Sequence, residues 1–386
     1  MTSDIRYVGV TDDKIDLFEG QYAVPNGITY NSYAIIDEKI AVFDTTDAAY
    51  TKIWLENLKA TLGGRRADYL VVQHMEPDHS SGIKEFAEEY PKATIVASRK
   101  AFDMMKNFFG KSFEGRRLIV GDGDVLHLGK HSLTFLAAPM VHWPEVIVSY
   151  ERTKKILFSA DAFGKFGYAR GKDAWRDEAR RYYIGIVSKY GAQVQLLLSK
   201  IRRLDIKAIY PLHGPMLSGE VGYYIDLYDV WSSYAPEEKG VTIAFASVYG
   251  HTRAVAKRIR DELTRRGIKV ALFDLSRCDE SSALSSAFRF SSLILASTTY
   301  NADVFPAMRS FLHALAERGF KNRTVALVEN GSWAPSAAKV MRAALESTCR
   351  DLSFAETEVR INGAPDDETE EKIKSLLNEI TKKCKQ

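Results

Sequence analysis

A short stretch after an apolar run carries four side chains that can bind a metal ion. The run Tyr69–Val72 is followed by Gln-His-Met-Glu-Pro-Asp-His, in which the candidate ligands are His74, Glu76, Asp78 and His79. A loop at the end of a strand can aim several side chains at one point, because no regular repeat fixes its backbone. The stretch therefore indicates a metal site built from nitrogen and oxygen ligands.

Three further candidate ligands follow other apolar runs. His142 lies in Pro-Met-Val-His-Trp-Pro, Asp161 follows Ile156–Phe158, and His213 follows Ala208–Tyr210. Four imidazoles and three carboxylates can fill two sites beyond tetrahedral coordination, whereas structural zinc prefers four ligands and often sulfur. A set rich in carboxylates therefore favours iron or manganese, and carboxylates also stabilise a ferric state by their charge.

A second group of polar residues, in the C-terminal part, is typical of a phosphate-binding loop. The apolar run Val241–Ala246 is followed by Ser247, Val248, Tyr249, Gly250, His251 and Thr252, and a predicted helix begins at once. Hydroxyls, a glycine and free backbone N–H groups at a helix N-terminus bind anions. Because no G-x-G-x-x-G motif is present, the loop favours a monophosphate such as that of FMN over a dinucleotide.

Two later loops strengthen the flavin interpretation. They contain Thr298, Thr299, Tyr300 and Asn301 after one apolar run, and Asn330, Gly331, Ser332 and Trp333 after the next. In a doubly wound sheet the carboxyl ends of the strands meet where ligands bind. We expect all three loops to contact FMN, with Tyr300 or Trp333 as candidates for stacking on the isoalloxazine ring.

The N-terminal part is predicted to be an α+β layered fold with two sheets. Short strands are expected at Ile40–Phe43, Tyr69–Val72, Thr94–Ala97, Leu133–Ala137, Val146–Tyr150, Ile156–Phe158 and Ala208–Tyr210, with helices at Ile83–Tyr90 and Asp177–Lys189.

The C-terminal part is predicted to be an α/β, doubly wound parallel sheet. Strands are expected at Val241–Ala246, Val270–Leu275, Leu293–Ala296, Thr324–Val328 and Phe354–Ile361. Apolar residues recur at helical spacing at Val255, Ile259 and Leu263, and again within Asp366–Lys383. The polar segment Ser232–Gly240 is the predicted linker, so the domains are expected to span residues 1–238 and 239–386.

Length, charge and cysteine content favour a two-domain protein that binds neither nucleic acid nor membrane. The 386 residues suit two domains, and 53 Lys+Arg against 50 Asp+Glu leave a net charge of +3, without the basic excess of a nucleic-acid-binding protein. No signal pattern opens the chain and no apolar run approaches the roughly 18 residues of a membrane helix, so no membrane partner is expected. The scattered Cys278, Cys349 and Cys384 indicate a reducing cytoplasm and no rubredoxin-type site.

The metal pattern resembles that of the flavodiiron protein family over essentially the whole chain. It comprises His-x-Glu-x-Asp-His, a later His, an Asp nineteen residues after it, and a His before Gly. The resemblance implies a metallo-β-lactamase-like αββα sandwich followed by a flavodoxin-like domain, with two non-haem irons and FMN. It implies that one iron takes His74, Glu76 and His142, that the other takes Asp78, His79 and His213, and that Asp161 bridges both.

The resemblance also implies an oxidoreductase that reduces dioxygen to water, nitric oxide to nitrous oxide, or both, with no catalytic residues beyond the metal ligands. Four electrons are needed for dioxygen and two for a pair of nitric oxide molecules, and a reduced FMN with a diferrous pair holds four. Rubredoxin or a similar small protein is the expected donor. A head-to-tail homodimer, or a dimer of such dimers, is expected to bring one subunit's FMN to the other's irons.

Several features depart from the family pattern. The separation of 52 residues between Asp161 and His213 is shorter than the family commonly shows, with the loss in the loop Gly164–Trp175. His251 stands where Asn or Ser is common, and Pro335 where many relatives carry Trp. The sequence leaves the preferred gas open, and two alternatives remain: a dizinc hydrolase with a flavodoxin-like regulatory domain, or a non-catalytic electron carrier or gas sensor.

Overall fold

The computed structural model describes residues 4–385 and separates into two compact units. One comprises Met1–Tyr183 and Tyr190–Asp229, and the other comprises Ile184–Lys189 and Val230–Gln386. The boundary at residues 238/239 expected for the domains stays a prediction. Within residues 4–385, none of the helices combines the length and the apolar content needed to cross a membrane.

The first unit is built on two six-stranded sheets. In spatial order the first sheet contains β1 (Ile5–Tyr7), β6 (Tyr33–Ile35), β7 (Ala41–Phe43), β8 (Tyr69–Val72), β9 (Thr94–Ala97) and β10 (Arg117–Ile119). The second contains β11 (Val125–His127), β12 (Ser132–Ala137), β13 (Ile147–Glu151), β14 (Ile156–Phe158), β15 (Ala208–Tyr210) and β16 (Leu217–Ser218). Two small sheets join β2 (Val10–Asp12) with β5 (Ile28–Tyr30), and β3 (Leu17–Phe18) with β4 (Tyr22–Ala23).

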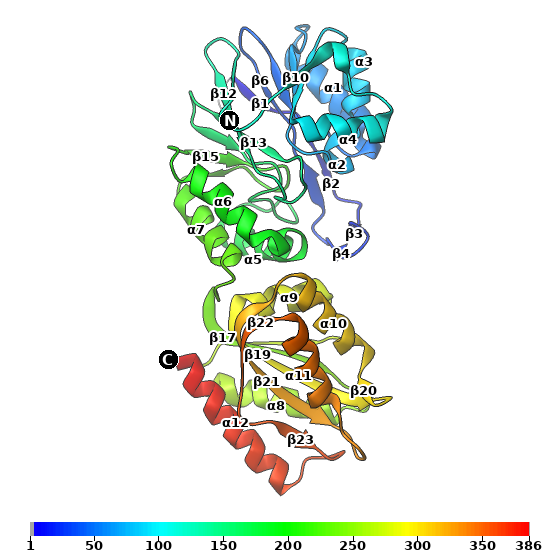
Figure 1. Ribbon diagram of the computed structural model, residues 1–386, viewed down its shortest axis with the longest axis vertical. Helices are drawn as coiled ribbons and strands as arrows, with labels where there is room; N and C mark the ends of the chain where they lie inside the picture. Colours follow the sequence, from blue (N-terminus) through cyan, green and yellow to red (C-terminus); the bar gives the residue numbers. More distant parts are fainter. Residues whose placement is uncertain (1–3, 386) are drawn as a thin grey trace. The chain divides into compact units, whose positions relative to one another are not determined.

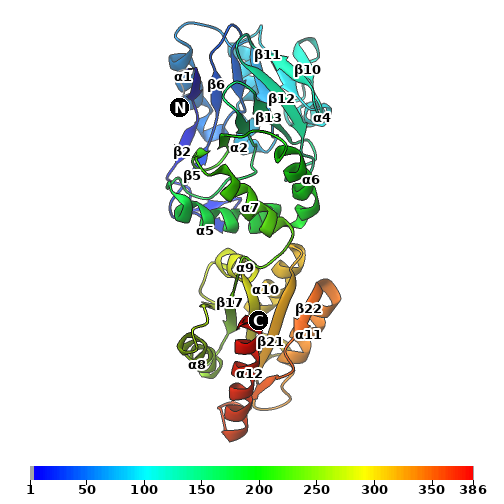
Figure 2. The same cartoon turned by 90° about the vertical axis from the view of Figure 1, so that its left-hand side faces the viewer.

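Helices cover both sides of this pair of sheets, which confirms the predicted αββα sandwich. On one side lie α1 (Thr51–Leu62), α3 (Ile83–Glu89) and α4 (Arg99–Phe109), and on the other α5 (Lys172–Tyr182), α6 (Gly191–Ile201) and α7 (Val221–Ser232) (Figures 1 and 2). Helix α1 shows why: Trp54, Leu58 and Leu62 form one buried stripe, and Gly63 ends the helix in the left-handed conformation.

The second unit is a parallel sheet with helices on both faces. In spatial order its parallel strands are β18 (Val270–Asp274), β17 (Glu238–Ala246), β19 (Phe290–Tyr300) and β21 (Lys321–Asn330), with β22 (Arg350–Phe354) and β23 (Val359–Ile361) beside β21. The short β20 (Asp303–Val304) pairs antiparallel with the end of β19. Its helices are α8 (His251–Arg265), α9 (Glu280–Arg289), α10 (Pro306–Glu317), α11 (Ala337–Thr348) and α12 (Asp367–Lys385). Apolar residues of α8 and α12 share one buried cluster with the sheet, while α9, α10 and α11 lie on the other face (Figure 1).

Several predicted elements differ from the observed ones by a few residues at their ends, and two differ more substantially. The helix expected at Asp177–Lys189 is α5, which begins at Lys172 and ends at Tyr182; a π-helical turn (Tyr183–Val187) follows. Charged residues dominate α5, and its buried residues include Arg180 and Arg181 beside the apolar Trp175, Ala179 and Tyr182. That sparse apolar pattern explains why its start is not evident from the sequence.

The strand expected at Phe354–Ile361 is interrupted. The Glu379 carboxylate on α12 accepts hydrogen bonds from the backbone N–H groups of Glu356 and Thr357. Those donors therefore leave the sheet, and β22 and β23 pair with β21 separately. The predicted linker is also shorter than expected, because Ser232 closes α7 and β17 already begins at Glu238.

The two sheets of the first unit meet at a pair of stacked phenylalanines. Phe43 on β7 and Phe158 on β14 are fully buried, with ring centroids 4.1 Å apart and planes 12° apart. We expect Phe158→Ala to lower the free energy of unfolding by about 3–5 kcal/mol, because it removes the ring and leaves a cavity. Urea unfolding of the metal-free full chain measures this; Leu196→Ala, at a side chain 65% exposed, is the control and should change little.

Candidate metal centre and flavin site

Four separate segments of the first unit bring the seven predicted metal ligands together. The ligands come from the segment after β8 and the short helix α2 (Pro77–Ser80), from the β12–β13 connection, and from the loops after β14 and β15. They form two groups, one of His74, Glu76, His142 and Asp161, the other of Asp78, His79 and His213, and the ligand atoms of each group lie within 4.8 Å of one another. All seven are buried except Glu76, which is partly exposed.

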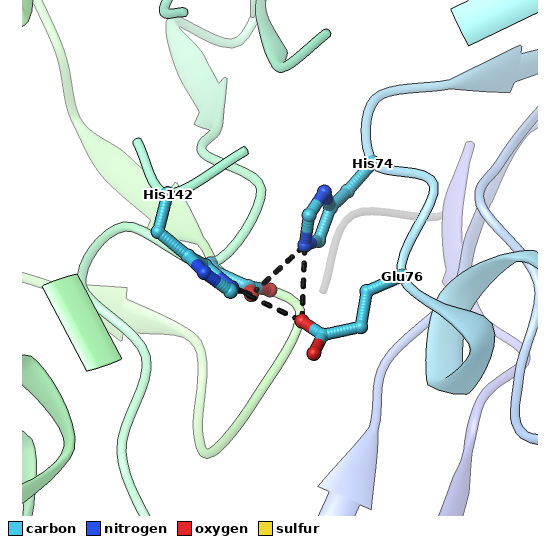
Figure 3. Close-up of side chains that lie close together, drawn as sticks. His74, Glu76 and His142 are labelled. Atoms are coloured by element: carbon cyan, nitrogen blue, oxygen red, sulfur yellow. Dashed lines mark hydrogen bonds and ion pairs between the residues drawn. The ribbon is translucent and has the colours of Figure 1, made fainter. Parts of the chain in front are cut away.

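The first group surrounds one point with two nitrogens and two oxygens. Nε2 of His142 lies 3.0 Å from Oε2 of Glu76 and 3.1 Å from Oδ2 of Asp161. Nε2 of His74 lies 3.2 Å from the same Glu76 oxygen and 3.4 Å from the same Asp161 oxygen. Figure 3 shows His74 and Glu76 directed toward His142 from a different loop.

The second group converges on the other oxygen of Asp161. Nε2 of His79 and Nε2 of His213 lie 3.0 Å apart, and each is 3.3 Å from Oδ2 of Asp78. Oδ1 of Asp161 is 3.3 Å from the His79 nitrogen and 3.9 Å from the His213 nitrogen. Asp161 thus turns one oxygen to each group, as a carboxylate shared by two metal ions must.

Buried atoms without partners show that cations fit here. Within the described residues, Oδ1 of Asp161 and both carboxylate oxygens of Asp78 are buried and accept no hydrogen bond. Buried polar atoms in native proteins nearly always have a partner, so we expect a bound group to contact these three oxygens. Two cations, held by imidazole and carboxylate donors without any sulfur, would satisfy them.

The close donors strongly perturb one another's protonation. Burial lowers the pKa of His142, but Asp161 and Glu76 outweigh it and raise that pKa to about 9. For His74, burial is likewise outweighed by Asp161 and other nearby carboxylates, so its pKa lies well above the ordinary value. Burial raises the pKa of Asp161, yet His74 and His142 bring it well below the usual range. Metal ions must therefore displace protons from the imidazoles.

Hydrogen bonds orient the imidazoles toward the two groups. Oε1 of Glu145 lies 2.8 Å from Nδ1 of His74 and also accepts a hydrogen bond from the backbone N–H of Met75. The carbonyl oxygen of Thr29 lies 2.7 Å from Nδ1 of His213. In both rings Nε2 is left facing the cluster, as expected for metal-binding histidines. Sequence reasoning missed both partners, although Glu145 lies three residues after His142.

Asp44 anchors the loop that carries His74. It follows β7, is fully buried and has a left-handed backbone with a φ of 51°. Its Oδ1 accepts hydrogen bonds from the backbone N–H groups of Gln73 and His74, at 2.7 and 3.1 Å. Burial raises the pKa of Asp44 to about 6, against the opposing effects of His79 and Gln73. This residue was also missed; its place after a buried strand was the available signal.

Aromatic rings surround the cluster. The rings of Phe18 and Tyr182 lie 5.3 and 5.5 Å from that of His213, and Trp143 lies 5.3 Å from His74. Phe166 in turn contacts both Phe18 and Tyr182. Such walls suit a small uncharged reactant and restrict water near the donors.

The histidines expected to be structural or to lie at the surface lie outside both groups. His131 is buried, with Nδ1 2.9 Å from Glu151 and Nε2 3.0 Å from Asp4. His127 and His313 are exposed.

The three predicted flavin loops of the second unit line one cavity of about 360 Å³. It is lined by Ser247, Val248, Tyr249, His251, Thr252, Thr298, Thr299, Tyr300, Asn330, Gly331, Ser332, Trp333 and Gly363. Gly250 and Asn301 were predicted contacts but do not line it, whereas Gly363 lines it and was missed. Pro335 is not among the lining residues. The volume falls within the range of small-ligand sites.

The floor of this cavity offers groups suited to a phosphate. Gly250 caps α8 with a φ of 101°, no side chain caps the first turn, and Oγ of Ser247 accepts a hydrogen bond from the Gly250 N–H. The Thr252 and Thr298 hydroxyls lie 3.1 Å apart, and the Asn330 amide donates to Thr252. Tyr249, Tyr300 and Trp333 present exposed rings. Free N–H groups at a helix N-terminus with nearby hydroxyls fit a phosphate, and the rings fit a flavin.

Comparisons with known proteins agree with this geometry. The family model described as ODP family beta lactamase matches residues 28–214, and the flavodoxin model matches residues 243–375. A nitric oxide reductase of Moorella thermoacetica is 30% identical over 362 residues, which cover 91% of this chain and 90% of that protein. The chain belongs to the flavodiiron protein family. Membership confirms the predicted fold class and the expected cofactors, a non-haem diiron centre and FMN.

Other flavodiiron relatives match over different shares of their length. The rubredoxin oxygen:oxidoreductase of Desulfovibrio gigas is 25% identical with a TM-score of 0.92, covering 100% of this chain and 98% of that one. The flavodiiron protein of Giardia intestinalis is 26% identical with a TM-score of 0.92, covering 100% and 95%. A diflavin flavoprotein of Synechocystis sp. is 33% identical over 277 residues, 68% of this chain, and the match spans 47% of that longer protein.

The hydrogen bond from His74 to Glu145 gives a direct test of the metal centre. We expect Glu145→Gln to weaken metal binding about 10- to 100-fold, because the carboxylate that orients His74 and makes its ring more basic is lost. Competition with a chelator measures the change. The control is Glu151→Gln, which alters a similarly buried His–Glu pair at His131. Equal metal affinity in both variants would show that Glu145 does not support a metal ligand.

Proposed function

We propose that this flavodiiron protein reduces dioxygen to water, nitric oxide to nitrous oxide, or both. The observation that carries the proposal is the Asp161 carboxylate, which turns one oxygen toward each of two groups of imidazole and carboxylate donors. Two of the relatives are named nitric oxide reductase and rubredoxin oxygen:oxidoreductase, which agrees with reduction of these gases.

The ligand roles follow from the two groups. His74, Glu76 and His142 would hold one iron, Asp78, His79 and His213 the other, and Asp161 would contact both. The iron pair would supply a place for a diatomic gas and electrons for its reduction. Phe18, Tyr182 and Trp143 wall that place with rings, so that the reactant meets the metal pair in apolar surroundings.

The second unit would provide the electron entry. Its cavity loops would hold FMN with the phosphate at the start of α8 and the ring system near the exposed aromatics. A flavin can take electrons from a small protein donor and pass them on. We propose rubredoxin or a similar protein as that donor, in agreement with the names of the relatives from Desulfovibrio gigas and Salmonella arizonae, the latter a flavorubredoxin.

A cytoplasmic location is part of the proposal. Cys278, Cys349 and Cys384 are all free in the structure, and two of them are buried. Reduced, scattered thiols are usual in reducing compartments. Alkylation of the protein in unlysed cells by a permeant reagent but not by an impermeant one would support this location, and labelling by the impermeant reagent would contradict it.

The deciding experiment measures gas consumption by the iron- and FMN-loaded protein. With reduced rubredoxin as donor, an oxygen electrode and, under anaerobic conditions, a nitric oxide electrode follow each gas separately. We expect sustained consumption of at least one gas and its loss in His79→Asn, which removes a ligand of the second group. The ratio of the two rates assigns the preferred gas. Consumption of neither gas by a fully loaded protein would refute the proposal.

We also propose a head-to-tail homodimer, or a dimer of such dimers, as the active form. The metal ligands lie in one unit and the flavin cavity in the other, so electron transfer needs an arrangement that brings the two cofactors close. A homodimer would bring them close if each flavin passes electrons to the irons of the partner subunit.

Complementation between defective subunits tests this arrangement. One variant loses the metal site by His79→Asn, and the other loses flavin binding by Thr252→Glu, which places a negative charge where the phosphate would bind. We expect each to be inactive alone and mixed, reassociated dimers to regain activity. Mixed dimers that form but stay inactive, or full activity in a monomer shown by sedimentation, would contradict the proposal.

A further inference from the structure

A cavity of the first unit is separate from the metal ligands. Its volume is about 730 Å³, which falls within the range of sites for small molecules. Ile156 of β14, Tyr210 of β15 and Leu217 of β16 line it, as do residues 170–172, where α5 begins. None of the seven metal ligands is among its lining residues, so this cavity needs an explanation of its own.

The charged side chains in the lining are all positive. They are Lys154, Arg170 and Lys172, and no aspartate or glutamate lines the cavity. Lys172 pairs with Glu220, whose side chain is 75% exposed. Among the residues that the structure describes, neither Lys154 nor Arg170 forms an ion pair. Cations that share a cavity without an opposite charge favour an anion there.

Two buried tyrosines in the lining lack hydrogen-bond partners. Tyr210 and Tyr224 are each 6% exposed, and neither hydroxyl forms a hydrogen bond within residues 4–385. Buried tyrosine hydroxyls usually have a partner. Burial raises the pKa of both hydroxyls, so they stay protonated and can donate. A ligand with oxygen acceptors in the cavity would provide the missing partners.

The rest of the lining suits an apolar group and the edge of an anion. Ile156, Met216 and Leu217 contribute apolar side chains. Gly171, which precedes α5, has a φ of 106°, and no side-chain hydrogen bond caps the first turn of that helix. Backbone N–H groups at such a helix start add to the donors that an anion can use. The cavity therefore combines donors for an anion with a surface for an apolar body.

We propose that this cavity binds a small organic anion in which a phosphate or similar dianionic group is attached to an apolar body. Arg170 and Lys154 would pair with the anionic group, since a guanidinium can bind two of its oxygens at once. The hydroxyls of Tyr210 and Tyr224 would donate to further oxygens. The apolar residues of the lining would contact the remainder of the ligand. The proposal goes beyond gas reduction and requires no step at the irons or the flavin.

Calorimetric titration of the iron- and FMN-loaded full chain tests this site. Phenyl phosphate is the probe, inorganic phosphate is the anion without an apolar body, and benzyl alcohol is a neutral ligand with a similar ring. Arg170→Met removes one exposed positive charge, and Tyr224→Phe removes one hydroxyl but keeps the ring. The matched control is Arg152→Met, because Arg152 is also exposed but does not line the cavity.

We expect one phenyl phosphate to bind per chain at this site, more tightly than inorganic phosphate, and benzyl alcohol to bind at least tenfold more weakly. Arg170→Met should weaken binding of phenyl phosphate about 10- to 100-fold, as expected for a lost hydrogen bond to a charged group. Tyr224→Phe should weaken it about 3- to 10-fold, because a single hydroxyl donor is lost. Arg152→Met should bind the probe as the unmodified protein does.

No binding of phenyl phosphate by the loaded protein would overturn the proposal. Binding that is unchanged in both Arg170→Met and Tyr224→Phe would also overturn it, since the probe would then occupy another place, such as the metal centre. Equal affinity for inorganic phosphate or for benzyl alcohol would contradict an organic anion as the ligand. Circular dichroism checks folding, and Arg170→Met decides the outcome if Tyr224→Phe does not fold, because the Arg170 side chain is exposed.

Discussion

The Asp161 carboxylate is placed between two groups of imidazoles, with one oxygen directed to each, and much of the first unit serves that placement. Three carboxylates and four imidazoles are gathered where little water reaches them. Charged groups in such surroundings are stable only when each faces an opposite charge or a metal ion. The raised pKa values of His74 and His142 and the lowered pKa of Asp161 express this mutual dependence.

The metal ligands lie close together because several strands end at one place. Strand β8 of the first sheet and strands β14 and β15 of the second each lead into a ligand loop, and stacked Phe43 and Phe158 join the two sheets beneath them. The loops themselves have an irregular backbone, and hydrogen bonds to side chains fix it. Asp44 accepts hydrogen bonds from the backbone N–H groups of Gln73 and His74, and Glu145 accepts one from that of Met75. The rigid sheets set the rough position, and these hydrogen bonds set the direction of each donor.

The second unit also forms its site at the ends of strands, but this site gathers fewer charged groups than the metal centre. Its parallel strands end on one side, where three loops and the start of α8 present backbone N–H groups and hydroxyls that suit a phosphate. Here the ligand brings the charge, and the protein needs only a neutral, well-shaped cavity with exposed rings. The residues that line this cavity agree with this: none of them is Asp, Glu, Lys or Arg, and His251 is the single titratable group other than tyrosine.

The sequence by itself determined the types and order of the metal ligands and the three flavin loops, because these follow apolar runs that form strands at or close to the predicted positions. Four of the predicted strands of the first unit, β8, β9, β14 and β15, have their predicted bounds. Such strands can be predicted from the sequence because a buried strand depends mainly on a few consecutive apolar residues.

Only the tertiary structure decided the partners that lie far away in the chain. Glu145 meets His74 across 71 positions, and the Thr29 carbonyl meets His213 across 184. The interruption between β22 and β23 has the same origin, since it depends on the Glu379 side chain of a later helix. Such contacts are selected by three-dimensional proximity, which composition and spacing do not encode at this distance.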